Sequence, residues 1–77
     1  MIVRETIYHG NYRNVRDVEC PLDGVETLTL LGATSPYRFT FSAENRWHVA
    51  AAEKFNRGES FDIGWADYEI IDPGASA

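Results

Sequence analysis

The segment SAENRWHVAAAEKFNRG, residues 42–58, carries the clearest structural pattern in the chain. Its apolar side chains recur at intervals of three and four residues, which places them on one stripe of a helix: Ala43, Trp47, Ala50, Ala51 and Phe55. The hydroxyl of Ser42 can cap the first turn. Gly58 can adopt the left-handed conformation that often follows a helix. The segment therefore predicts a helix over about residues 43–57.

On both sides of this helix the sequence favours β-strands. Four strands are expected before it, at Met1–His9, Val15–Glu19, Val25–Leu31 and Tyr37–Phe41. After the helix, apolar residues alternate from Phe61 and the alternation changes phase before Tyr68. Either a bulge near residues 64–66 or a tight turn that makes a hairpin would explain this change. The expected fold is α+β, with an antiparallel sheet of four to five strands packed on one helix, in the order β-β-β-β-α-β.

Length and composition indicate one small globular domain. It spans residues 1–77, with an ordered part over residues 1–72 and a short tail over residues 73–77. Cys20 is the single cysteine, so no internal disulfide forms and the chain suits a reducing compartment. The N-terminal residues do not resemble a secretory signal, and no apolar run approaches the roughly 18 residues that span a bilayer. We therefore expect a cytoplasmic protein that does not contact the membrane.

Few residues suit catalysis or metal binding. Cys20 could pair with His9 or His48 as a thiol and imidazole, but a small semi-buried cysteine at a strand end and a solvated helix histidine are the simpler interpretations. A metal site would need three or four ligands at suitable spacing. Asp67 and Glu69 share a strand face at a separation that would suit a small hydrolase-like enzyme, which is one alternative. We expect no enzymatic activity, no catalytic residue, no metal and no cofactor.

The net charge is concentrated in the last part of the sequence. Residues 1–57 carry seven acidic and seven basic side chains, whereas residues 58–77 carry five acids and no lysine or arginine, which gives the formal charge of −5. The five acids are the candidate partner-binding residues: Glu59, Asp62, Asp67, Glu69 and Asp72. Negative charge disfavours direct binding to nucleic acid, and a one-signed surface favours a basic partner. The alternative interpretation is an edge strand that uses charge to prevent aggregation.

The 77-residue length, the net charge of −5 and the acidic run GESFDIGWADYEIID give the chain a profile that resembles the anti-CRISPR proteins of phages and mobile elements. The resemblance covers the profile of the whole chain and includes no shared motif. It implies a non-enzymatic inhibitor, in some cases a DNA mimic, that blocks a basic nucleic-acid-binding surface of a CRISPR effector complex. The alternative is a small structural or oligomerisation module that forms a homodimer through an exposed sheet face or edge, around Trp65 or Tyr12.

Overall fold

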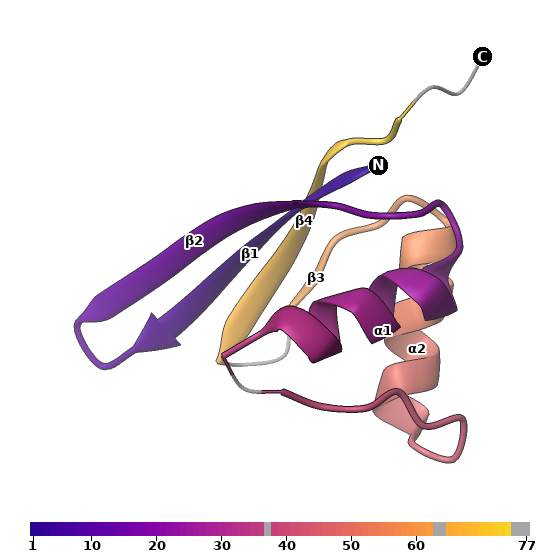
Figure 1. Cartoon of the computed structure of the whole chain (residues 1–77), viewed down its shortest axis with the longest axis horizontal. Helices are drawn as coiled ribbons and strands as arrows, with labels where there is room; N and C mark the ends of the chain where they lie inside the picture. The colour runs from indigo at the N-terminus through magenta and orange to yellow at the C-terminus, as the bar shows by residue number, and fades with distance from the viewer. Residues whose placement is uncertain (37, 63–64, 75–77) are drawn as a thin grey trace.

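The computed structural model describes residues 1–36, 38–62 and 65–74. Within these residues the chain forms four strands and two helices, and the strands make one antiparallel sheet in the order β2-β1-β4-β3. The elements are β1 (Ile2–His9), β2 (Tyr12–Glu19), α1 (Gly24–Thr34), α2 (Arg46–Asn56), β3 (Phe61–Asp62) and β4 (Ala66–Asp72). Figure 1 shows the helices gathered at one end of the sheet, with the β1–β2 hairpin reaching past them. The α+β class and the antiparallel sheet are confirmed, but the predicted β-β-β-β-α-β order is wrong.

The N-terminal hairpin is longer and tighter than the sequence pattern predicts. β2 begins at Tyr12 rather than at Val15, and His9 pairs directly with Tyr12. Only Gly10 and Asn11 therefore connect the strands. Gly10 has a φ of 55°, a conformation that favours glycine in tight hairpin turns. The pairing then continues in one register along both strands.

The predicted strand Val25–Leu31 is wrong, because this segment forms most of helix α1. The carboxylate of Asp23 accepts a hydrogen bond from the backbone N–H of Glu26 at 3.0 Å, which caps the first turn. The buried residues of the helix lie at intervals of three and four: Gly24, Thr27, Leu28, Leu31 and Gly32. Two glycines and a threonine in this stripe hide its helical period from a search for apolar residues.

Helix α2 is confirmed, although it is shorter than the predicted range 43–57. Its N-cap is Asn45, whose side-chain oxygen accepts from the backbone N–H groups of Trp47 and His48, and not Ser42. The segment before it does not form the predicted strand over residues 37–41. Residues 38–41 have no regular structure, and residue 37 lies outside the described residues. Phe39 instead donates its backbone N–H to the carbonyl of Gly32, which fixes this loop against α1.

The prediction of a single helix is also wrong, because α1 and α2 pack against each other. Their contact depends on the absence of a side chain at Gly24, where an added Cβ would lie 1.9 Å from the carbonyl oxygen of Ala52. The backbone N–H of Gly24 donates to the side-chain oxygen of Asn56 at 2.7 Å. The end of α2 thus satisfies one of the free N–H groups at the start of α1.

At the C-terminal end, the structure favours the hairpin over the bulge. Phe61 pairs with Tyr68 and Asp62 pairs with Asp67, so β3 and β4 are antiparallel neighbours. The connecting residues 63 and 64 lie outside the described residues, as do residues 75–77 of the predicted tail. Pro73 and Gly74 follow β4 without regular structure.

The core lies between one face of the sheet and the two helices. Its buried members come from three strands, both helices and the residue after β2: Val3, Ile7, Cys20, Leu28, Leu31, Ala51, Phe55, Phe61, Ala66 and Tyr68. Neither helix of the described part of the chain is long and apolar enough to cross a membrane.

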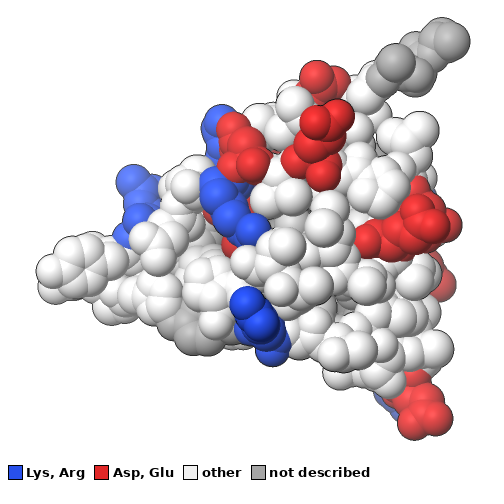
Figure 2. All heavy atoms as spheres, viewed as in Figure 1, with Lys and Arg blue, Asp and Glu red and all other residues white. Residues whose placement is uncertain are grey.

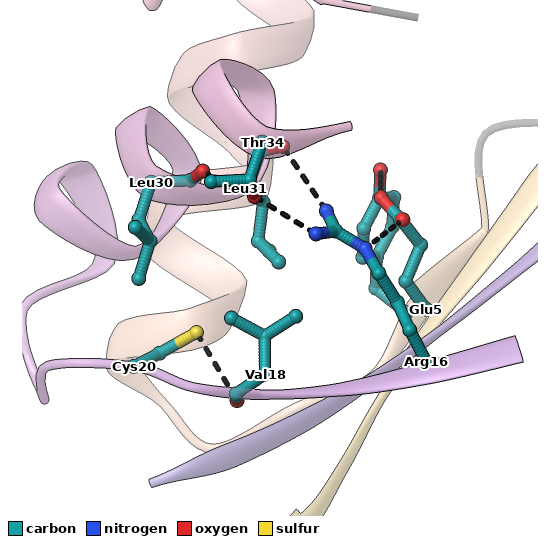
Figure 3. Close-up of polar contacts among 8 residues, drawn as sticks. Glu5, Arg16, Val18, Cys20, Leu30, Leu31 and Thr34 are labelled. Atoms are coloured by element: carbon teal, nitrogen blue, oxygen red, sulfur yellow. Dashed lines mark hydrogen bonds and ion pairs between the residues drawn. The ribbon is translucent and has the colours of Figure 1, made fainter. Parts of the chain in front are cut away.

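One carboxylate lies among these apolar residues. Glu5 of β1 is fully buried, and it accepts a hydrogen bond from the Tyr68 hydroxyl at 2.7 Å and from Nε of Arg16 at 2.6 Å. The other guanidinium nitrogens of Arg16 reach the last turn of α1, where they donate to the Thr34 hydroxyl and to the carbonyl of Leu31 (Figure 3). This network therefore joins β4, β1, β2 and α1 through the side chains of Tyr68, Glu5 and Arg16.

We expect Tyr68→Phe to weaken the network and to change how stability depends on pH. Burial, followed by the hydrogen bond to Glu5, raises the pKa of Tyr68 far above its ordinary value of 10.0. The protonated phenol therefore contributes stability that is complete below about pH 10 and is lost as the pH rises further. Tyr68→Phe should lower the free energy of unfolding by about 1–3 kcal/mol at neutral pH, because Glu5 loses a buried partner.

The variant should also lose less stability than the wild type above about pH 10, as measured by urea unfolding at several pH values. Tyr12→Phe is the matched control, because the Tyr12 side chain is 77% exposed. An identical alkaline loss of stability in the wild type and Tyr68→Phe would show that the phenol is not held in its protonated form.

Candidate functional site

The face of the sheet turned away from the helices carries rows of polar side chains. In one row Arg4 of β1 lies between Asp17 of β2 and Glu69 of β4, its paired residues on either side. Nε of Arg4 and Oδ1 of Asp17 are 2.9 Å apart, and both carboxylate oxygens of Asp17 accept from this guanidinium. The ion pair lowers the pKa of Asp17 and raises that of Arg4, to which the charge of Glu69 also contributes.

The next row places two carboxylates directly opposite each other. Asp62 of β3 and Asp67 of β4 are paired residues, with Thr6 of β1 on the other side of Asp67. Like charges at opposed positions of an antiparallel pair destabilise the sheet. Tyr8 offsets part of this cost, because its hydroxyl donates to Oδ2 of Asp67 at 2.6 Å. That hydrogen bond is also the main cause of the raised pKa of Tyr8.

Three of the five predicted acids surround one open hollow on the surface. It has a volume of about 400 Å³ and lies across β3 and β4. We call it the acidic hollow; its lining residues are Ser60, Phe61, Asp62, Asp67, Tyr68 and Glu69. Asp62 and Glu69 are exposed and Asp67 is partly exposed, so all three carboxylates can be reached from solvent. Its lining is mostly apolar, and the three carboxylates are its charged groups.

The other two predicted acids lie apart from the acidic hollow. Glu59 follows α2 and forms an ion pair with Arg57, with 2.6 Å between Oε2 and Nε, which lowers the pKa of Glu59. Asp72 ends β4 and accepts from the backbone N–H of Gly74 at 2.9 Å. In Figure 2 the acidic side chains occupy several separate places on the visible face, and basic side chains lie close to some of them. The predicted acids therefore do not form one uninterrupted ladder without cations.

The sequence misses the residues that β1 contributes to this face. Arg4 and Tyr8 alternate with the buried positions of β1, so the alternation alone could have placed both on the outer face. Their position beside Glu69 and Asp67 follows from the central place of β1 between β2 and β4. This strand order is a tertiary feature that no local pattern predicts.

β4 is partly a central strand and partly an edge strand. Asp67 and Tyr68 are paired on both sides, with β1 and with β3. Among the described residues, Glu69 and Ile70 pair with β1 alone. Protection of an open edge can therefore explain the charges of Glu69 and of Asp62, because β3 is the outermost strand of the described sheet. It does not explain the charge of Asp67, which lies on β4 between β1 and β3.

His48 does not have the predicted solvated position. Its side chain is 8% exposed and its Nδ1 accepts the backbone N–H of Ser42 at 3.0 Å. The imidazole packs against three aromatic rings with centroid separations of 5.2–5.9 Å: those of Phe39, Phe41 and Trp47. This histidine joins the start of α2 to the preceding loop, which is a structural role.

Cys20 is buried, as the sequence predicts. It lies 4% exposed just after β2, and its Sγ is 3.5 Å from the carbonyl oxygen of Val18 (Figure 3). Burial is the main cause of the raised pKa of this thiol. A reactive cysteine needs the opposite, a lowered pKa and an accessible sulfur. Within residues 1–36, 38–62 and 65–74, no three His, Cys, Asp or Glu side chains are grouped so that they could hold a metal ion.

Comparisons of the chain with protein-family models, with curated proteins and with solved structures give no match. The function is therefore argued from the chain's own surfaces.

We expect Cys20 to react slowly with iodoacetamide at neutral pH. Burial limits access to the sulfur and keeps the thiol protonated, so alkylation should be at least about tenfold slower in the native chain than in urea. The rate can be followed by mass spectrometry. A native rate equal to the rate in urea would reveal an accessible thiolate and would revive the thiol–imidazole interpretation.

Proposed function

We propose that this chain is a non-enzymatic inhibitor that binds a host protein or complex through the acidic hollow. The observation that carries the proposal is the opposed pair Asp62 and Asp67, with Glu69 beside them. Acidic side chains gathered at one exposed site favour a partner of opposite charge.

The chemistry of the acidic hollow suits a partner with a basic, nucleic-acid-binding groove. Residues two apart on a strand are about 6.8 Å apart, so Asp67 and Glu69 present successive negative charges, as the phosphates of a DNA strand do. Lysine and arginine side chains spaced for phosphates can therefore meet Asp67 and Glu69 in turn. The sharpest version of the proposal is an anti-CRISPR protein that blocks such a groove in a CRISPR effector complex, acting in the cytoplasm of the host cell.

The same geometry favours binding over catalysis. General acid catalysis by a carboxyl group at neutral pH needs an environment that holds the proton, such as an apolar pocket. Asp62 and Glu69 are exposed to solvent, and Asp67 accepts a hydrogen bond from Tyr8. We infer that these groups act as charges and not as proton donors.

Glu59 and Asp72 are proposed as contacts at the margin of the interface. Glu59 follows the end of α2 and Asp72 ends β4, so both lie outside the acidic hollow. Exposed charges at the rim of an interface mainly affect the rate of association and its dependence on salt. Their substitution should therefore change affinity less than substitution inside the acidic hollow.

The test is charge reversal in the acidic hollow with a matched control. The double variant Asp62→Lys, Glu69→Lys leaves the hydrogen bond between Tyr8 and Asp67 in place. Glu44→Lys, Glu53→Lys changes the net charge by the same amount at exposed positions on another part of the surface. Both variants and the wild type would be added to a panel of purified CRISPR effector complexes, and DNA binding by each complex would be measured by gel shift.

We expect the wild type to reduce DNA binding by at least one complex, with weaker inhibition at higher salt. The variant in the acidic hollow should lose at least about tenfold in potency, and the control should retain it. Equal potency of all three proteins, with the fold intact by circular dichroism, would refute the acidic hollow as the binding surface. Failure of the wild type to inhibit any complex of the panel would refute the anti-CRISPR version.

A further inference from the structure

β2 is an edge strand with no bulge, no proline and charges of both signs. It is the outermost strand of the sheet within the described residues, and its eight residues pair with β1 without a bulge. The strand has no proline. Its charged side chains, Arg13, Arg16, Asp17 and Glu19, sum to zero. Edge strands avoid association through bulges, prolines, charged side chains or inward-pointing charges. The charges of β2 are of both signs, so they can pair with the opposite charges of a second copy.

The hydrogen-bond pattern fixes which groups of β2 are directed outward. Met1 and Cys20 exchange both backbone hydrogen bonds, at 2.7 and 3.1 Å. In an antiparallel pair such exchanges recur at every second residue, so the even-numbered residues of β2 bond to β1. The N–H and C=O groups of the odd-numbered residues, Arg13, Val15 and Asp17 among them, therefore point away from the sheet.

We propose that the outer edge of β2 pairs with β2 of a second copy of this chain, on a two-fold axis at Val15. In this register the two Val15 residues exchange backbone hydrogen bonds. Arg13 of each copy then lies opposite Asp17 of the other copy, which gives two complementary ion pairs. The result is a continuous antiparallel sheet with four strands from each copy.

Other two-fold registers of the same edge are less favourable. An axis at Arg13 or at Asp17 places like charges opposite each other, and an axis at Arg16 places two arginines side by side. An axis at Asn14 places the charged Arg13 opposite the apolar Val15, so no ion pair forms there. The axis at Val15 alone combines an apolar centre with opposite charges on both sides.

The exposed apolar residues of the hairpin support this register. Val15 is 57% exposed on the outer face of the sheet, and Tyr12 is 77% exposed on the other face. With the axis at Val15, each Tyr12 lies opposite Val18 of the other copy, so both exposed residues gain apolar neighbours. Figure 1 shows the tip of the hairpin projecting beyond the helices.

The charge of the chain does not oppose this association. In the paired sheet the two β4 strands are separated by five strand spacings, about 24 Å. That separation exceeds the Debye length of about 10 Å at moderate salt, so repulsion between the acidic hollows is screened. The pairing does not depend on the proposed inhibitory function, and it would leave both acidic hollows open to partners.

The first test is the oligomeric state of the full chain by sedimentation equilibrium. We expect a reversible dimer in the wild type and dissociation that is at least about tenfold easier in Val15→Glu, because two carboxylates would meet at the axis. Val25→Glu is the matched control, since Val25 is also exposed, at 41%, but lies on α1. A monomeric wild type at all concentrations, or a dimer that Val15→Glu leaves intact, would overturn the proposal.

The second test uses two variants that repel themselves and attract each other. Arg13→Asp and Asp17→Arg should each be monomeric, because residues 13 and 17 then have the same sign in each homodimer. Mixed together, they should form a heterodimer with two ion pairs, one in the wild-type orientation and one reversed. Circular dichroism would confirm that each variant is folded, and two folded variants that remain monomeric in the mixture would refute the register.

Discussion

The buried carboxylate of Glu5 is the constraint on which the rest of the structure depends. A charge inside a small core is stable only while its hydrogen-bonding partners stay in place. Tyr68 and Arg16 supply those partners from the strands on either side of β1. Arg16 continues to the end of α1, so the position of that helix is linked to the same carboxylate. The network therefore fixes how β1, β2, β4 and α1 are placed relative to one another. Apolar contacts alone would define this placement less well.

This arrangement also determines what the outer face of the sheet presents. Tyr68 points inward to Glu5, so its neighbours on β4, Asp67 and Glu69, must point outward. The same alternation on β1 brings Arg4 and Tyr8 beside them. The positions of the three acids are therefore set by the core, which includes Phe61 and Tyr68 of the lining. In the proposed inhibitor, charges placed in this way would need little ordering on binding.

The sequence predicts those features that depend on local pattern. The alternation of β1, the helix of residues 46–56 and the outward direction of Asp67 and Glu69 all follow from spacing. Helix α1 could not be predicted from apolar spacing, because Gly24 and Gly32 are buried for close packing and not for hydrophobicity. Glu26, three residues after Asp23, is typical of the start of a helix. The pair Asp23 and Gly24 is also typical of a turn, and a turn is the interpretation that the sequence alone favours. To predict that Arg4 lies beside Glu69 would have required the strand order, which is set by tertiary contacts.

The most direct measurement of the central constraint is a double-mutant cycle between Glu5→Gln and Arg16→Met, followed by urea unfolding. Arg16→Met alone leaves a charged Glu5 without its cation in the core, and Glu5→Gln removes that charge. The double variant should therefore be more stable than the sum of the single effects implies, with a coupling energy of at least about 1 kcal/mol. Additive effects of the two substitutions would show that the buried carboxylate and the guanidinium are energetically independent, and would contradict the role given to the network.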